Sequence, residues 1–156
     1  TVAVIGGGNT AVEDALYLEK LASKVYLVHR RDALRADKIL CDRLEKSGVQ
    51  VIWDSVVQNL DGENNLSQMT LKNVKNDTLT AVSVDGVFVA IGQLPESNLF
   101  DDVQKTSAGY IVTDENMRTN IDGVFAVGDV REKTLRQVVT ACADGALAGA
   151  LCAQEA

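Results

Sequence analysis

The chain has 156 residues, of which 46% are hydrophobic and 24% charged, an ordinary composition for a globular protein. Its net charge of −7 argues against a nucleic-acid binder, because such proteins need a basic surface for phosphate backbones. No apolar stretch approaches the roughly 18 to 20 residues of a membrane span, and no signal-peptide pattern opens the chain. We therefore expect a cytoplasmic protein that binds neither nucleic acid nor membrane. Because Thr1 already lies in an apolar run, we also expect a piece of a longer polypeptide.

The three cysteines and the single histidine predict no metal site. Cys41, Cys142 and Cys152 form neither a Cys-x-x-Cys pair nor a zinc-ligand spacing. Cys142 and Cys152 fall within one predicted helix, where ten residues separate them by about 15 Å, too far for a disulfide. We expect both to be buried as small apolar groups.

The first residues predict a dinucleotide-binding loop. An apolar run, residues 1–5, stops at Gly6-Gly7-Gly8 and gives way to a helical pattern, the strand–turn–helix context that such a loop requires. Gly6 permits a tight turn, Gly8 lets a pyrophosphate approach the backbone, and Ala11 is small where helix and strand meet.

The start of the predicted helix carries capping residues. Asn9 and Thr10 can cap it, and Glu13 follows Thr10 by three residues, as in a capping box. Such a cap would leave free N–H groups and the positive end of the helix dipole facing a phosphate.

The helix is expected to end near Ser23, and residues 24–29 then predict a second, parallel strand. In NAD-binding versions of this β-α-β unit an acidic residue ends that strand. Here the strand runs into His29, Arg30 and Arg31, with Arg35 close behind.

The arginines favour NADP as the cofactor. The extra phosphate of NADPH carries about −1.5 to −2 charges, and guanidinium groups match its geometry and sign. Two charge-assisted hydrogen bonds would discriminate against NADH by about a hundredfold. The alternative is that Arg30, Arg31 and Arg35, interleaved with Asp32 and Asp37, form a solvated helix start.

The next segment predicts an α/β fold with an insertion. A helix is expected over 37–47, closed by Gly48 as a C-cap, and a third strand over 49–53. Short alternating segments then predict a three-stranded antiparallel meander at residues 56–60, 66–74 and 79–84. The apolar run 87–91 predicts a strand buried on both faces.

Ile91 and Gly92 end that strand at the edge where ligands bind, so we expect them to approach the cofactor; an ordinary turn glycine is the alternative. A domain boundary is expected close by. Beyond it, residues 110–112 and 123–127 predict strands, and a small-residue helix is expected from about residue 135 to the end. Its glycines predict close packing against another element.

Four motifs carry a resemblance to a known family: residues 6–13, residues 29–36, residues 85–92, and residues 123–130 followed by 136–141. Over essentially its whole length the chain resembles bacterial-type, low-molecular-weight thioredoxin reductases. The resemblance implies that residues 1–93 are an NADPH-binding domain lacking its first residues. It also implies that residues 94–156 are the C-terminal segment of a second, FAD-binding Rossmann-like domain, whose N-terminal half lies elsewhere.

The candidate residues follow from the loop and from the resemblance. Those for NADPH are Gly6, Gly7, Gly8, Asn9, Thr10, His29, Arg30, Arg31, Arg35, Ile91 and Gly92. Those for FAD, implied by the resemblance alone, are Gly128, Asp129, Arg136, Gln137 and Val138.

The resemblance implies a fragment of an NADPH-dependent flavoprotein disulfide oxidoreductase. In the complete family member, which is a homodimer, NADPH reduces FAD, the flavin reduces a Cys-x-x-Cys pair, and that pair reduces thioredoxin as one domain rotates against the other. The pair is not in this chain, so we expect no catalytic residue here, little activity alone and no bound flavin after purification.

Three alternatives stay open. A thioredoxin-reductase-like ferredoxin–NADP reductase is disfavoured by Arg136-Gln137, and an alkyl hydroperoxide reductase flavoprotein by Arg30, Arg31 and Arg35. A non-catalytic NADPH-binding module is compatible with the chain as it stands.

Overall fold

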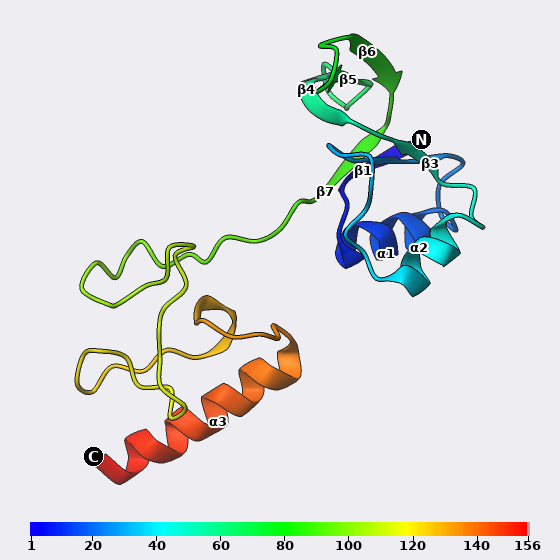
Figure 1. Ribbon diagram of the computed structural model, residues 1–156. Helices are drawn as coiled ribbons and strands as arrows, with labels where there is room; N and C mark the ends of the chain where they lie inside the picture. Colours follow the sequence, from blue (N-terminus) through cyan, green and yellow to red (C-terminus); the bar gives the residue numbers. More distant parts are fainter. Residues whose placement is uncertain (156) are drawn as a thin grey trace. The chain divides into compact units, whose positions relative to one another are not determined.

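The computed structural model describes residues 1–155 and divides into two compact units, Thr1–Gly92 and Gln93–Ala156, here called the first and second units (Figure 1). Each is described by itself.

A four-stranded parallel sheet forms the centre of the first unit. Its strands are β1 (Val2–Gly6), β2 (Val25–Val28), β3 (Gln50–Ile52) and β7 (Gly86–Ala90). They lie in the order β3-β2-β1-β7, with Ala3 and Val4 of β1 completely buried. The glycine loop and the end of β2 therefore lie at the same edge, because parallel strands share the side on which they end.

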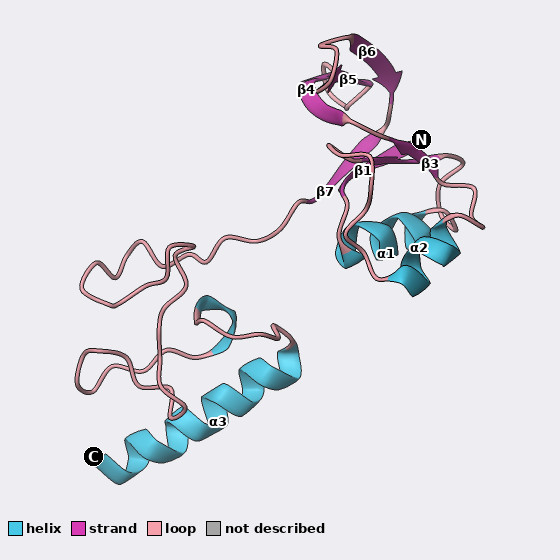
Figure 2. Cartoon of the chain, in the orientation of Figure 1, coloured by secondary structure: helices cyan, strands magenta, loops and turns pink. Residues whose placement is uncertain are grey.

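Two helices, α1 (Asn9–Leu18) and α2 (Lys38–Leu44), cover one face of this sheet (Figure 2). Most of the apolar positions that recur at helical spacing point inward as expected, but Leu21 and Ile39 are 68% and 70% exposed. The core on this side joins the two helices to β1 and β2 through Val4, Val12, Ala15, Leu27 and Leu40.

A three-stranded antiparallel meander covers the other face, made of β4 (Ser55–Asp61), β5 (Gln68–Asn73) and β6 (Leu79–Ser83). Its middle strand contributes Met69 and Leu71, which pack against Ala3 and Val28. The predicted α/β fold, a parallel sheet with an inserted meander, is confirmed.

Several local predictions for the first unit are wrong. Gly8, not Asn9 or Thr10, is the N-cap of α1, and no side chain caps that helix. The helices end at Leu18 and Leu44, earlier than predicted, and Gly48 donates its N–H to the Glu19 carboxylate instead of closing α2.

The last strand is also less buried than predicted. In β7, Phe88 and Val89 are 44% and 69% exposed. These side chains are exposed because β7 pairs only with β1 and so forms the edge of the sheet within the described residues.

The second unit has little regular structure apart from α3 (Val138–Glu155) and a short 3-10 helix, η1 (Gly128–Val130). The predicted strands at 110–112 and 123–127 are wrong, because among the described residues their backbones make only isolated bridges, such as Ile111 with Arg131. A small core gathers Val103, Ile111 and Ala126.

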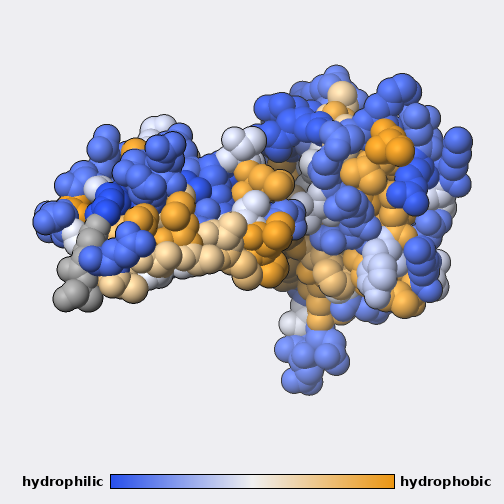
Figure 3. Space-filling model, turned by 90° about the horizontal axis from the view of Figure 1, so that it is seen from below, coloured by the Kyte–Doolittle hydropathy of each residue, from blue (hydrophilic) through white to orange (hydrophobic). Residues whose placement is uncertain are grey.

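The small-residue face of α3 is exposed, contrary to expectation. Nothing lies within 4 Å of a Cβ built on Gly145 or Gly149, and Cys142 and Cys152 are exposed rather than buried. Figure 3 shows apolar side chains along this helix, where Val138 is 80% exposed. No helix among residues 1–155 is long and apolar enough to cross a membrane.

Gly6 leads to the first prediction, because a Cβ there would overlap the Ala90 carbonyl oxygen and lie 2.7 Å from the Cβ of Ala11. We expect Gly6→Ala to destabilise the first unit by about 2 kcal/mol through overpacking. Urea unfolding followed by fluorescence of Trp53, the only tryptophan, measures this. Gly86→Ala is the matched control, since a Cβ there makes only an ordinary van der Waals contact, 3.6 Å from a methyl group of Val2. Equal midpoints for both variants would contradict the prediction.

Candidate dinucleotide-binding site

A pocket of about 460 Å³ lies at the carboxyl ends of β1, β2 and β7. Apolar side chains of β4 and β7 form much of its wall. Six residues predicted from the sequence line it: Gly6, Gly7, His29, Arg30, Arg35 and Ile91.

Gly7 makes room for the imidazole of His29. A Cβ on Gly7 would overlap the His29 ring, so the glycine loop and the histidine pack directly against each other. Trp53 meets the same ring edge-on, with the ring centroids 6.3 Å apart. The position of Gly7 therefore determines where the imidazole lies.

His29 is an unusual polar group because it is only 5% exposed and its Nε2 atom has no hydrogen-bond partner among the described residues. A buried polar atom without a partner carries a free-energy cost. His29 also lines the pocket.

Two contacts tie the arginine loop, residues 30–37, to the glycine loop. The Arg35 N–H donates to the Gly7 carbonyl at 2.7 Å. The Asn9 amide donates to the Asp37 carboxylate at 2.7 Å and accepts from the Asp37 N–H at 2.8 Å. Asn9 thus joins the starts of the two helices instead of capping one of them.

The guanidinium groups of Arg30, Arg31 and Arg35 are exposed and form no ion pair or hydrogen bond within residues 1–155. The nearby Asp32 carboxylate contacts Lys75 instead, at 3.4 Å. Lys75 also meets Asp54 at 2.8 Å, and the hydrogen bond to Asp54 raises the pKa of Lys75. The arginines are therefore available to an anionic ligand.

Five predicted residues do not line the pocket: Gly8, Asn9, Thr10, Arg31 and Gly92. Gly8 lies at the N-terminus of α1, and a Cβ built on it would meet no atom within 4 Å. The same holds for Gly92, which has a φ of +120°.

A second, smaller pocket of about 200 Å³ belongs to the second unit and is lined in part by Asp129 and Tyr110. Gly128 precedes Asp129 with a φ of +78°, a conformation that favours glycine. Asp129 is exposed and has no partner among the described residues.

The other predicted residues of this unit lie at the start of α3. The Arg136 guanidinium lies over the Tyr110 ring, 3.8 Å from its centroid, and its Nε atom is buried without a partner. The Gln137 N–H donates to the Thr140 hydroxyl, and Val138 begins the helix.

A buried charged cluster in this unit was not predicted. Asp144 of α3 is 7% exposed and contacts Arg131 and Lys133. Its hydrogen bonds to Arg131, the strongest influence, hold the pKa of the Asp144 carboxyl well below its usual range. The signal in the sequence was an acidic residue in the interior of a helix of small apolar residues.

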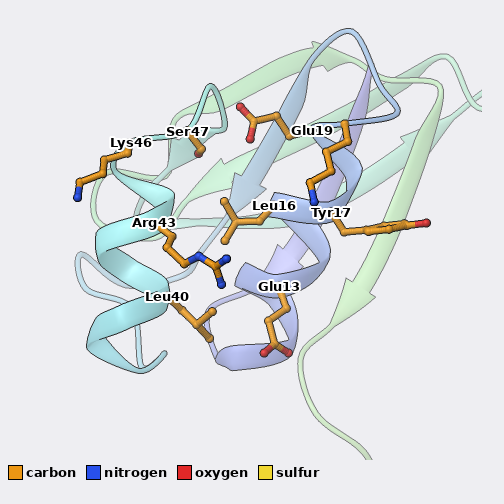
Figure 4. A pocket seen from close by; sticks show the side chains of 9 residues that line it. Glu13, Leu16, Tyr17, Glu19, Leu40, Arg43, Lys46 and Ser47 are labelled. Carbon is orange, nitrogen blue, oxygen red and sulfur yellow. The ribbon is translucent and has the colours of Figure 1, made fainter.

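The described residues offer no metal site, and a third pocket, between α1 and α2, adds no candidate site for the nucleotide. Residues 1–155 contain no group of three or more His, Cys, Asp or Glu that could hold a metal ion. A groove of about 510 Å³ between α1 and α2, lined by residues that include Arg43 and Glu13, contains none of the predicted site residues (Figure 4).

A family model for pyridine nucleotide-disulphide oxidoreductases matches residues 1–145. The chain belongs to this family. Among its relatives, a 34.2 kDa protein in the rubredoxin operon of Clostridium pasteurianum is 49% identical over 147 residues, 93% of this chain and 48% of that protein. The thioredoxin reductase of Listeria monocytogenes is 48% identical over 149 residues, 94% of this chain and 47% of that protein.

Solved structures similar to this chain include thioredoxin reductases as well. Thioredoxin reductase of Lactococcus lactis superposes with a TM-score of 0.84 at 42% identity, covering 98% of this chain and 52% of that one. That of T. acidophilum gives 0.83 at 25% identity, covering 99% and 52%. The resemblance to thioredoxin reductases is confirmed, and the chain spans about half the length of the curated relatives it matches.

Proposed function

We propose that this chain is the NADPH-binding part of a disulfide oxidoreductase that reduces thioredoxin through FAD and a Cys-x-x-Cys pair. Residues 1–93 supply the NADPH domain, and residues 94–156 supply one segment of the FAD domain. The proposal includes a homodimeric whole protein in the cytoplasm that binds neither nucleic acid nor membrane. The similarity to thioredoxin reductases over 94% of the chain supports it.

The observation that carries the proposal is the pocket beside the glycine loop. It combines a buried imidazole whose Nε2 atom lacks a hydrogen-bond partner with arginines that have no counter-ion within residues 1–155. A phosphate provides acceptors for guanidinium donors and for an imidazole N–H. Gly6, Gly7 and Gly8 would hold the pyrophosphate, with Asn9 and Thr10 at the helix start. His29, Arg30, Arg31 and Arg35 would hold the 2′-phosphate, and Ile91 and Gly92 would flank the nicotinamide half.

The second unit fits a polyol-containing group less completely. Asp129 offers a free carboxylate beside Tyr110, which suits the hydroxyls of a ribityl chain. Gly128, Arg136, Gln137 and Val138 would lie along the flavin. Bound FAD supplies the two-electron chemistry that links NADPH to a disulfide.

Calorimetric titration of this chain with NADPH and with NADH, at one salt concentration, tests the proposal. We expect NADPH to bind about a hundredfold more tightly, because Arg30 and Arg35, the two arginines that line the pocket, would donate charge-assisted hydrogen bonds to the extra phosphate. Equal affinities would mean that the arginines are a solvated face. The absence of heat from either nucleotide would contradict the assignment of the pocket.

A further inference from the structure

Asp144 is buried in the second unit although it lies on a helix of small apolar residues. Its carboxylate is nearly excluded from solvent, at 7% exposure. An ionised carboxylate in such a place must be satisfied by hydrogen bonds and by opposite charge. The groups that satisfy it identify its role.

Among residues 1–155, every hydrogen bond that the Asp144 carboxylate accepts comes from one short segment, residues 128–133, which begins with η1. The Gly128 N–H donates to Oδ2 at 3.0 Å. Arg131 donates from Nε to Oδ2 at 2.8 Å and from Nη2 to Oδ1 at 3.0 Å, and Lys133 Nζ donates to Oδ2 at 2.8 Å. A single side chain therefore holds both ends of the segment against α3.

The two cations fix the carboxylate in place. Arg131 binds it through both oxygens, and the same guanidinium donates to the Thr113 hydroxyl at 3.2 Å. The side chains of Arg131 and Lys133 are only 16% and 8% exposed. This fork restricts the carboxylate to one orientation, in which Oδ2 faces the Gly128 N–H.

Gly128 and Asp129 form the turn that this bond restrains. Gly128 has a φ of +78°, and a Cβ on it would meet only the Cβ of Ala141, at 3.7 Å. Glycine is therefore required for backbone conformation rather than for space. Asp129 next to it is exposed and lines the small pocket with Tyr110.

We propose that Asp144 is the positioning residue of the Gly128–Asp129 turn: its carboxylate, oriented by Arg131 and Lys133, holds the Gly128 N–H and so presents the Asp129 carboxylate to a polyol ligand. The identity of that ligand as the ribityl chain of FAD rests on the proposed function. The role of Asp144 in positioning the turn is independent of it and rests on the contacts above.

The test must distinguish the hydrogen bond to the Gly128 N–H from the neutralisation of Arg131 and Lys133. Both cations are therefore removed first. In an Arg131→Met/Lys133→Met background, Asp144→Asn keeps a carbonyl acceptor for the Gly128 N–H, whereas Asp144→Leu removes it. Neither variant buries an unpaired charge, so their thermal midpoints should be similar. Amide hydrogen exchange of Gly128 is then measured by NMR on the labelled full chain, with Ala126 as the internal reference because its N–H donates to the Met117 carbonyl.

We expect Gly128 exchange in the leucine variant to be about tenfold faster than in the asparagine variant of the same background, the effect of one lost hydrogen bond. Asp129→Asn is the matched control and should leave Gly128 exchange unchanged. Wild-type protection of Gly128 in the leucine variant would overturn the proposal. If that variant does not fold, Asp144→Ala in the same background gives the same comparison.

NADPH titration of the same proteins keeps the two proposals apart. The nucleotide pocket lies in the first unit, so NADPH affinity should be unchanged in all of these variants. A chain that binds no NADPH but shows the predicted Gly128 exchange would contradict the proposed function alone.

Discussion

Asp144→Ala in the otherwise unchanged chain should destabilise the second unit by about 3 kcal/mol, because removing one partner of a buried ion pair leaves uncompensated charge behind. Here two cations, Arg131 and Lys133, would lose their carboxylate, and the Gly128 N–H would lose its acceptor. The remaining exposure of Arg131, 16%, places the expected cost at the lower end of the range for buried pairs.

Urea unfolding followed by the methyl NMR signals of Val103 and Ile111, which lie in the core of this unit, measures the loss. Trp53 fluorescence reports the first unit in the same sample and should not change. Asp129→Ala is the control acid from the same turn and should alter stability by less than about 0.5 kcal/mol, because Asp129 is exposed. A similar effect of the two substitutions would show that the buried cluster does not stabilise the unit.

The same cluster predicts a response to acid. The pKa of Asp144 is lower in the folded chain than in the unfolded chain, mainly because of Arg131. Its contribution is therefore complete above the unfolded pKa of about 4 and is lost as the pH falls below that value. We expect the second unit to lose about 1 kcal/mol from this source between pH 6 and pH 3. The Asp144→Leu/Arg131→Met/Lys133→Met variant lacks the group, so a loss of equal size in that variant would exclude Asp144 as the cause.

Local patterns were enough to predict most of the first unit. The period-two and helical patterns correspond to elements that pack on both faces of one sheet, where each apolar face finds a partner within the unit. The glycine loop and the ends of β1 and β2 followed from topology, because parallel strands end at one edge. The role of Asn9 could not be predicted in this way. Its partner Asp37 lies 28 residues away, and the local pattern instead favours a helix cap.

The second unit was predicted less well for a physical reason. Strands at 110–112 and 123–127 need neighbours to pair with, and the described residues supply only single bridges. Burial of Cys142 and Cys152 likewise depends on what covers α3, which the helical pattern does not specify. Asp144 was missed because its partners are separated from it by 11 to 16 residues and are joined to it only by the fold.

Arg30→Ala/Arg35→Ala should abolish the preference for NADPH over NADH, a change of about a hundredfold, while leaving the NADH affinity unaltered. Both side chains line the pocket, and neither has a partner within residues 1–155, so their removal breaks no structural contact. Folding stability should therefore stay within about 0.5 kcal/mol of the wild type.

Calorimetry at low and high salt measures this prediction. Because the arginines are exposed, the wild-type preference should shrink as salt screens the phosphate, whereas the double variant should show no preference to lose. Arg43→Ala is the matched control, an exposed arginine in the groove between α1 and α2 rather than in the nucleotide pocket. Arg31→Ala should have a smaller effect than either pocket arginine, because Arg31 does not line the pocket. A double variant that still prefers NADPH by a hundredfold would move the phosphate site to Arg31 and away from the geometry described above.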